Sequence, residues 1–319
     1  MSFPESFLSL QSLTPVDLKQ LSREQKIKLL QTYRASGARN ANKMLFLATD
    51  LLAGGSSGLS SSELYDVYEQ VLIASLECGR IEKATMYLNL LESRFGKKSV
   101  RVSHLRGLCL EAQGKIQDAK KLYEQVLKDM PTNDFCVKRL SAMYKSEGNY
   151  EEAIRVLEED LVYTDEDGKQ HSYFEVHRGD ALLTYRELSN LHYLLGSIEK
   201  AIFYAEECLL FDTESYFAHV RLGELYYIKR DLPRCVVEYA QSLLFNSQHN
   251  NSRAAYGLWQ AANEMLRQHH SGLKKIEEEA ELTQTQDLRT FAAETLRRMY
   301  AGTPMLSALD AYLQREASH

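Results

Sequence analysis

The sequence is poor in helix-breaking residues and in long apolar runs. Its 319 residues include 5 prolines and 16 glycines, while leucine, alanine, glutamate, lysine and tyrosine are plentiful. This balance favours helix over sheet. No run reaches the roughly 18 consecutive apolar residues that mark a membrane span, and the first residues lack a basic segment followed by an apolar one. Neither a transmembrane helix nor a signal peptide is therefore expected.

A surplus of positive charge and paired cysteines are also lacking. The formal net charge is -6, so there is no basic excess to neutralise the phosphates of a nucleic acid. The 5 cysteines lie far apart without a CxxC pair, which indicates reduced thiols in the cytosol. Cys208 and Cys235 occupy positions that need small side chains, so packing explains both of them. We expect no nucleic-acid partner.

Catalytic signatures are missing as well. The sequence contains no GxGxxG, P-loop, GxSxG or HExxH motif. His269 and His270 are neighbours on an expected helix, point about 100° apart and have no further ligand at metal spacing, which indicates a surface pair. His192 is expected as a packed imidazole, and the glutamates at 277–279 as a solvated helix face. We expect no enzyme activity, no cofactor and no bound metal.

What the sequence does contain is a helical repeat with a period of roughly 34 residues. In the clearest copy, Gly107, Gly114, Ala119, Tyr123 and Pro131 form the small–turn–small–aromatic–proline skeleton of the tetratricopeptide repeat. The corresponding residues of the other copies are Ser141, Gly148, Ala153 and Leu157; Ser189, Gly196, Ala201 and Ala205; Gly223, Cys235 and Tyr239; Tyr256 and Gly257; and, upstream, Gly79, Ala84 and Leu88. Chance amphipathicity does not hold phase over so many residues, so the sequence resembles tetratricopeptide-repeat proteins.

Small side chains recur where the two helices of each unit must approach most closely. These positions are Gly107, Ser141, Ser189 and Gly223 on the first helix, and Ala119, Ala153, Ala201 and Cys235 on the second. Tyr123 and Tyr239 are expected to fill the gap toward the next unit. The sequence therefore predicts an all-α fold, a tetratricopeptide-repeat superhelix (α-solenoid) of about five to six helical hairpins with N- and C-terminal capping helices.

Composition divides the chain into three parts. Residues 1–62 are expected to contain N-terminal helices and a Gly/Ser-rich linker, and residues 63–265 to form the repeat solenoid. Residues 266–319 read as two helices without repeat spacing, which is typical of a capping segment.

Local signals refine these parts. Thr14 followed by proline and an acidic third residue indicates a helix N-terminus, and apolar spacing supports a helix over 15–36. A second short helix is expected over 41–53, followed by a flexible linker over 54–62. Residues 162–180 insert 14 extra residues between two repeats, and their polar composition predicts a loop, with a lengthened helix end as an alternative.

The inner helices of the later repeats present a mixed surface. In tetratricopeptide repeats, fixed positions of the first helix of each unit line the concave groove. The groove residues expected here are Arg186, Asn190, Tyr193, Leu194, Phe217, Glu224, Tyr227 and Ile228. Aromatic and aliphatic side chains with a few polar groups suit an apolar peptide or helix of a partner protein. Packing along the groove wall is the alternative explanation for the tyrosines.

A second possibility is a carboxylate clamp of the kind that co-chaperones use for the C-terminus of a heat-shock protein. Arg186, Asn190 and Arg221 imitate part of such a clamp. The next unit has Asn251 and Ala255 where basic groups would be needed. The clamp is incomplete, and an apolar partner segment is favoured.

Some longer stretches carry a more specific signal. The clearest are YEQV at 68–71, LYEQVLKDMPTN at 122–133 and RAAYGLWQAANE at 253–264. These stretches resemble a narrower family, subunit 2 of the endoplasmic reticulum membrane protein complex, and the resemblance covers residues 63–265. The chain departs from the family pattern in the acidic insertion near 165–168 and in the tail after Leu266.

This resemblance implies a cytosolic scaffold on the cytoplasmic face of the endoplasmic reticulum membrane, held there by other subunits of the complex. The family's role is to help insert tail-anchored and multi-pass proteins, and the family has no catalytic residue or cofactor to transfer. The alternatives are a free cytosolic adaptor or co-chaperone and, less favoured, a regulatory subunit of an enzyme.

Overall fold

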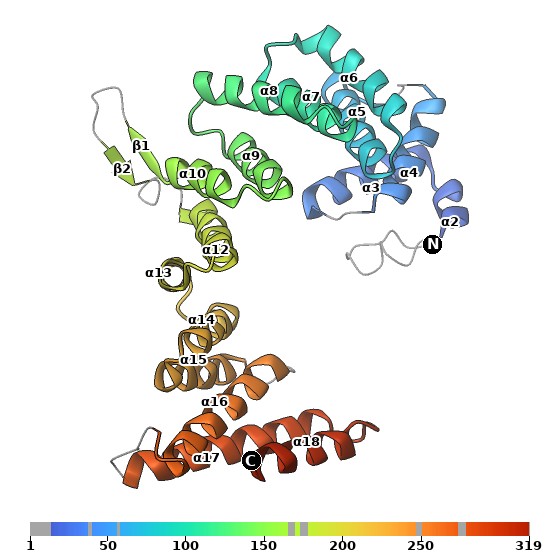
Figure 1. The fold of residues 1–319 in the computed structure, drawn as a ribbon. Helices are drawn as coiled ribbons and strands as arrows, with labels where there is room; N and C mark the ends of the chain where they lie inside the picture. Colours follow the sequence, from blue (N-terminus) through green and yellow to red (C-terminus); the bar gives the residue numbers. More distant parts are fainter. Residues whose placement is uncertain are drawn as a thin grey trace. The chain divides into compact units, whose positions relative to one another are not determined.

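The computed structural model describes residues 14–37, 40–55, 58–164, 170–172, 178–246, 251–273 and 279–318. These residues form helices and one short β-hairpin (Figure 1). The chain divides into two compact units, Met1–Gly148 and Asn149–His319, called unit 1 and unit 2 below.

Unit 1 begins with two helices where the sequence predicted one, because a second N-cap starts a new helix. Thr14 caps helix α2 (Pro15–Gln20) as the sequence predicted. The expected single helix over 15–36 is wrong, because the chain turns at Ser22 and starts helix α3 (Arg23–Ser36). The Ser22 side chain accepts from the backbone N–H of Gln25, and the Gln25 side chain accepts from the Ser22 backbone N–H. This reciprocal box satisfies N–H groups that a helix start leaves unpaired, so it favours a new start over continuation.

The next helices share one core with the repeats. Helix α4 (Ala41–Ala53) confirms the expected helix over 41–53. Helix α5 (Ser61–Glu77) starts at a capping box on Ser60, so the last residues of the expected linker belong to a helix start. A single cluster of buried side chains runs from Leu18 to Cys109, across the boundary expected at residue 62.

The rest of unit 1 is built of packed helices. They are α6 (Ile81–Phe95), α7 (Val100–Ala112), α8 (Ile116–Asp129) and α9 (Asp134–Ser146). Helix α5 packs on α6, α7 packs on α8, and α8 packs on α9. The pairs α5/α6 and α7/α8 are the helical hairpins that the repeat predicts.

Unit 2 continues the same construction. Its helices are α10 (Tyr150–Asp160), α12 (Arg178–Leu194), α13 (Ile198–Leu209), α14 (Tyr216–Lys229), α15 (Leu232–Phe245), α16 (Ser252–His270), α17 (Glu279–Met299) and α18 (Leu306–Ser318). The hairpins are α12/α13, α14/α15 and α16/α17. Leu309 and Leu313 of α18 enter the same core as Tyr239 and Leu258 of the repeats. The two tail helices that the sequence predicted are therefore α17, which pairs with α16 in the last hairpin, and α18; the boundary expected after residue 265 falls inside α16.

The insertion contains structure that the sequence did not predict. Strands β1 (Val162–Thr164) and β2 (Gln170–Ser172) pair antiparallel, with Tyr163 opposite His171. The expected loop is wrong for these strands, and residues 165–168 lie outside the described residues. The sequence Val-Tyr-Thr is rich in residues that favour strands, a signal hidden by the polar composition around it. Helix α12 begins inside the insertion, as the lengthened helix end anticipated.

Tyrosine rings occupy the space that helical glycines leave open. A Cβ atom added to Gly107 would lie 2.3 Å from the ring of Tyr123. Tyr239 is enclosed by two glycines, because a Cβ on Gly257 would lie 2.3 Å from its ring and one on Gly223 would lie 2.9 Å from it. The space that the small residues of the first helix leave open is thus filled mainly by a tyrosine ring from the second helix. Only glycine permits this contact.

The other small positions are also buried. Ser189 Oγ donates a hydrogen bond to the Ala201 carbonyl oxygen at 2.8 Å, which fixes α12 against α13. The positions Ala119, Ser141, Ala153, Ser189, Ala201 and Cys235 are each 3% exposed or less.

Alanine at the helical glycines should destabilise the protein in a graded way. Gly107→Ala and Gly257→Ala force a tyrosine ring to move, so each should lower the free energy of unfolding by about 1–3 kcal/mol. Gly223→Ala should cost less, because its Cβ would stand farther from the ring. Urea unfolding followed by circular dichroism measures all three. Helix propensity alone favours alanine over glycine by roughly 0.5–1 kcal/mol, so stabilisation of all three variants would refute the packing explanation.

Candidate functional site

The residues considered as metal ligands do not form a metal site in the described part of the chain. Within the described ranges, no three His, Cys, Asp or Glu side chains come together as possible ligands of a metal ion. His269 and His270 end helix α16, with His270 exposed. Glu279 is exposed, while Glu277 and Glu278 lie outside the described residues. Among the described residues, no helix is both long enough and apolar enough to cross a bilayer.

The cysteines are buried thiols or, in one case, half-buried. All five are unpaired. Burial raises the pKa of the Cys208 thiol to about 11 and that of Cys235 to about 12. Since the thiolate is the reactive form, both stay unreactive at neutral pH. Packing therefore accounts for the two cysteines that the sequence singled out.

His192 lies in the interior of unit 2. Its ring is 4% exposed and stacks on Tyr204, with the ring centroids 5.3 Å apart and the planes 7° from parallel. His192 Nε2 lies 3.6 Å from the Glu158 Oε1 atom, too far for a good hydrogen bond. Burial lowers the pKa of His192, Lys200 lowers it further, and Glu158 opposes them. His192 is thus a packed, neutral imidazole at pH 7.

A hollow of about 470 Å³ opens on unit 2 between the first helices of successive repeats. We call it the unit 2 hollow. It is lined by Tyr193, Arg221, Glu224, Tyr227, Ile228, Tyr239, Arg253, Gly257 and Gln260. Helices α12, α14, α15 and α16 contribute these side chains. Its floor includes the Tyr239–Gly257 contact, so the packing that holds the repeats together also shapes the hollow.

The polar groups of the hollow centre on one carboxylate. Glu224 of α14 pairs with Arg253 of α16, and its Oε2 atom lies 3.7 Å from Arg221 Nη1. The Arg221 guanidinium carbon also stands 4.7 Å from the centroid of the Tyr193 ring. Two cations thus flank one anion, with one cation held over an aromatic face. The arrangement can receive a further acceptor group beside apolar surface.

Apolar side chains form the rim of the hollow. Tyr193 is 39% exposed and Ile228 is 44% exposed. Tyr227 is half-buried against the core, and burial raises the pKa of its hydroxyl. Tyr227 therefore belongs partly to the wall, which agrees with the packing alternative for this residue, while Tyr193 and Ile228 face solvent.

The structure brings together half of the predicted groove residues. Tyr193, Glu224, Tyr227 and Ile228 line the hollow. The others lie outside it on the same two helices. Arg186, Asn190 and Leu194 are exposed along α12, and Phe217 is 64% exposed in the first turn of α14. The Phe217 ring lies 4.1 Å from that of Tyr216.

Sequence reasoning missed Arg253 and Gln260 of α16. Both lie in the hollow, although they fall outside the repeat positions that usually line a groove. Arg221 carried a readable signal, because it precedes Glu224 by three residues on one helix face. Arg253 carried none, since its pairing with Glu224 depends on how α16 packs on α14.

The carboxylate clamp was expected to be incomplete, because Asn251 and Ala255 stand where basic groups would be needed. Asn251 is 5% exposed, and its side chain caps α16 and donates to Ser242 Oγ at 2.9 Å. Ala255 is fully buried. Arg221 is already stacked and faces Glu224. Asn251, Ala255 and Arg221 are thus engaged within the fold, while Arg186 and Asn190 are exposed on α12.

Comparison with known proteins first defines the class. A family model described as tetratricopeptide repeat matches residues 110–171. The crystal structure of the C-terminal part of a tetratricopeptide repeat-containing protein from Cytophaga hutchinsonii superposes with a TM-score of 0.57 at 12% identity, covering 90% of this chain and 99% of that chain. This likeness concerns the fold alone. The expected fold class, an all-α tetratricopeptide-repeat protein of the α-solenoid type, is confirmed apart from the β-hairpin.

Closer relatives define the family. ER membrane protein complex subunit 2 of Xenopus tropicalis is 31% identical over 246 residues, which are 76% of this chain and 77% of that protein. ER membrane protein complex subunit 2 of Dictyostelium discoideum is 32% identical over 181 residues, 57% of this chain and 52% of that protein. The chain belongs to the family of ER membrane protein complex subunit 2, as the resemblance indicated.

The buried His192 should make stability depend on pH. Its pKa is lowered in the folded protein, so the unfolded chain binds the proton more tightly. The contribution of neutral His192 is complete above about pH 6.5 and is lost as the pH falls through the range below it. His192→Phe keeps the stacking on Tyr204 but removes the titration. Urea unfolding at about pH 7.5 and about pH 5 should show a smaller loss for the variant. His104, whose pKa is also lowered, is present in both proteins, so its effect cancels. An equal loss of stability in the wild type and the variant would rule out His192 as a source of the pH dependence.

Proposed function

We propose that this chain is a non-catalytic scaffold subunit of the ER membrane protein complex, bound peripherally on the cytoplasmic face of the endoplasmic reticulum membrane. It supports the insertion of tail-anchored and multi-pass proteins by holding the other subunits of the complex. Membership of the subunit 2 family supports this role. The repeat architecture, which presents surfaces for other proteins, supports it too.

The observation that carries the proposal is the unit 2 hollow. Its rim exposes Tyr193 and Ile228, while Glu224, Arg221 and Arg253 place charge beside them. Apolar side chains grouped around a concavity are typical of protein interfaces, whose centres are rich in aromatic residues and arginine. We assign to this hollow a segment of another subunit that inserts apolar side chains against the rim.

The groove extends from the hollow along its two helices. Leu194 and Phe217, which are 53% and 64% exposed, continue the apolar surface on α12 and α14. Arg186 and Asn190 supply exposed polar groups further along α12. A bound segment that extends beyond the hollow would therefore meet both polar and apolar side chains on these two helices.

Removing the exposed rim should weaken assembly of the complex without unfolding the subunit. Truncation of an interface anchor commonly costs about 2 kcal/mol or more, roughly a thirtyfold loss of affinity. We expect the double variant Tyr193→Ala and Ile228→Ala to recover much less of the complex. A tagged copy is purified from detergent-solubilised membranes, and the co-purifying subunits are identified and quantified by mass spectrometry. Circular dichroism checks the helical content.

A matched control truncates exposed apolar residues elsewhere in unit 2. Val237→Ala with Leu244→Ala removes side chains of α15 that are 56% and 68% exposed and do not line the hollow. This control should assemble normally. A folded rim variant that still assembles fully would place the contacts outside the hollow. Recovery of heat-shock chaperones in place of membrane subunits would favour the free adaptor.

A further inference from the structure

Unit 1 contains a second concavity, which the proposed function does not use. It measures about 380 Å³ and lies between the start of α5, the end of α6 and the start of α7. We call it the unit 1 pocket. Leu91, Val102 and Leu105 are each at most 4% exposed and form its floor. Its size falls within the range of roughly 300–1,000 Å³ that is usual for ligand sites.

Two aromatic rings form one side of this pocket. The Tyr65 and Phe95 rings meet edge to face, with their centroids 5.0 Å apart. Phe95 is 51% exposed although it lies beside a buried floor. Burying such a ring under a partner would be favourable, since aromatic side chains contribute strongly to binding. The pocket therefore offers an apolar cavity with an open aromatic edge.

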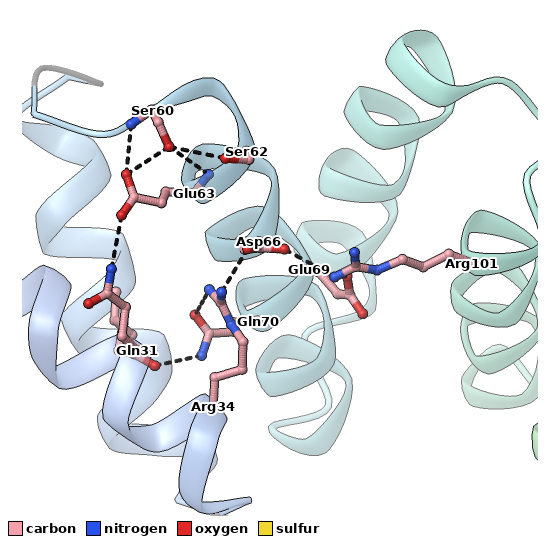
Figure 2. A network of polar contacts seen from close by, with 10 residues as sticks. Gln31, Arg34, Ser60, Ser62, Glu63, Asp66, Glu69, Gln70 and Arg101 are labelled. Atoms are coloured by element: carbon pink, nitrogen blue, oxygen red, sulfur yellow. Dashed lines mark hydrogen bonds and ion pairs between the residues drawn. The ribbon is translucent and has the colours of Figure 1, made fainter.

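The opposite wall is charged but balanced. Figure 2 shows how Asp66 lies between Arg34 and Arg101, while Arg101 also reaches Glu69. Arg34 Nη1 lies 2.7 Å and Arg101 Nη2 3.1 Å from the Asp66 carboxylate oxygens, and Arg101 Nη2 lies 2.5 Å from Glu69 Oε2. Two arginines thus neutralise two carboxylates, so this wall contributes little net charge to the pocket.

The rim beside the aromatic rings carries positive charge that no carboxylate among the described residues pairs with. Arg94 lines the pocket with its guanidinium carbon 5.9 Å from the centroid of the Tyr65 ring. Lys97 and Lys98 are exposed in the turn that joins α6 to α7, between Phe95 and Ser99, which both line the pocket. In the described part of the chain, these three cations have no carboxylate partner within ion-pair distance.

The turn that carries Lys97 and Lys98 is fixed in place. The Arg106 guanidinium donates to the Lys97 carbonyl oxygen at 3.3 Å and pairs with Glu92 at 2.7 Å. The backbone of the turn is therefore held in place while the side chains of Lys97 and Lys98 stay exposed. A local excess of positive charge on a chain whose net charge is -6 is complementary to an acidic ligand.

We infer that the unit 1 pocket binds an acidic peptide segment of a partner protein, with one large apolar side chain inserted between Phe95 and the floor. Aspartate or glutamate residues beside that side chain pair with Arg94, Lys97 and Lys98. The hydroxyls of Ser61, Ser62 and Ser99, which line the pocket, lie where they can bond the peptide backbone. An anionic membrane surface fits less well, because a concave site with Asp66 and Glu69 in its wall does not match a flat layer of negative head groups.

The test uses the full chain and a displayed library of short random peptides. Selected peptides are made with a fluorescent label, and their affinities are measured by anisotropy for the wild type and for Arg94→Glu with Phe95→Ala. We expect the selected peptides to contain a large apolar residue flanked by acidic ones. The double variant should bind them at least tenfold more weakly, and added salt should weaken wild-type binding. Arg94→Glu alone provides a second variant that keeps every apolar contact.

A control variant makes the same changes elsewhere in unit 1. Lys121→Glu with Met86→Ala reverses an exposed charge on α8 and truncates a side chain of α6 that is 50% exposed, both outside the pocket. It should bind the peptides as the wild type does. The inference is overturned if no acidic peptide is selected, or if the double variant binds such peptides undiminished. Pelleting with phosphatidylserine vesicles by the wild type alone, without peptide binding, would overturn it in favour of a lipid site. None of these outcomes depends on the unit 2 hollow.

Discussion

The contact between a tyrosine ring and a helical glycine is the constraint on which the packing around Tyr123 and Tyr239 depends. Tyr239 fills the gap between Gly223 and Gly257, and Tyr123 lies against Gly107. The Tyr239 ring spans two neighbouring repeats, so it sets the distance between α14 and α16, which carry exposed side chains. Because interiors are packed as densely as organic crystals, a displacement of the ring cannot be absorbed locally. The same contact forms part of the floor of the unit 2 hollow, so packing and the candidate site are coupled.

Polar contacts fix the register that ring packing leaves open. Tyr123 donates to Glu111, which also accepts from Arg139 Nε at 3.0 Å, so α7, α8 and α9 share one carboxylate. This network is partly buried, and its carboxylate is satisfied by donors from two residues, Tyr123 and Arg139. In unit 2, the Ser189 bond to Ala201 has the same effect on α12 and α13. The helices are thus held in fixed register, which gives their exposed side chains fixed positions.

The sequence predicts those features that a residue type alone decides. Glycine, alanine and tyrosine at a fixed period identify the hairpins, because sterics leave few substitutes at these positions. The helix over 41–53 follows from its cap and apolar spacing. The break at Ser22 was readable in principle, since Gln25 completes the capping box. The place of Arg253 beside Glu224 was not, because it depends on the packing of one repeat on the next. For the same reason the hollow contains half of the expected groove residues.

Charge separates the two concavities more clearly than shape does. In the unit 2 hollow, Glu224 lies between Arg221 and Arg253 and offsets much of their charge. The partner segment that we propose for this hollow would be selected mainly by the fit of its apolar side chains, which depends little on salt. In the unit 1 pocket, the wall is neutral and the turn at Lys97 and Lys98 adds charge that is exposed to solvent and screened by ions. Exposed charge of this kind speeds association and discriminates between partners more than it adds affinity. If both proposals hold, two segments of different character would bind the chain at separate sites, which is what a scaffold of several proteins requires.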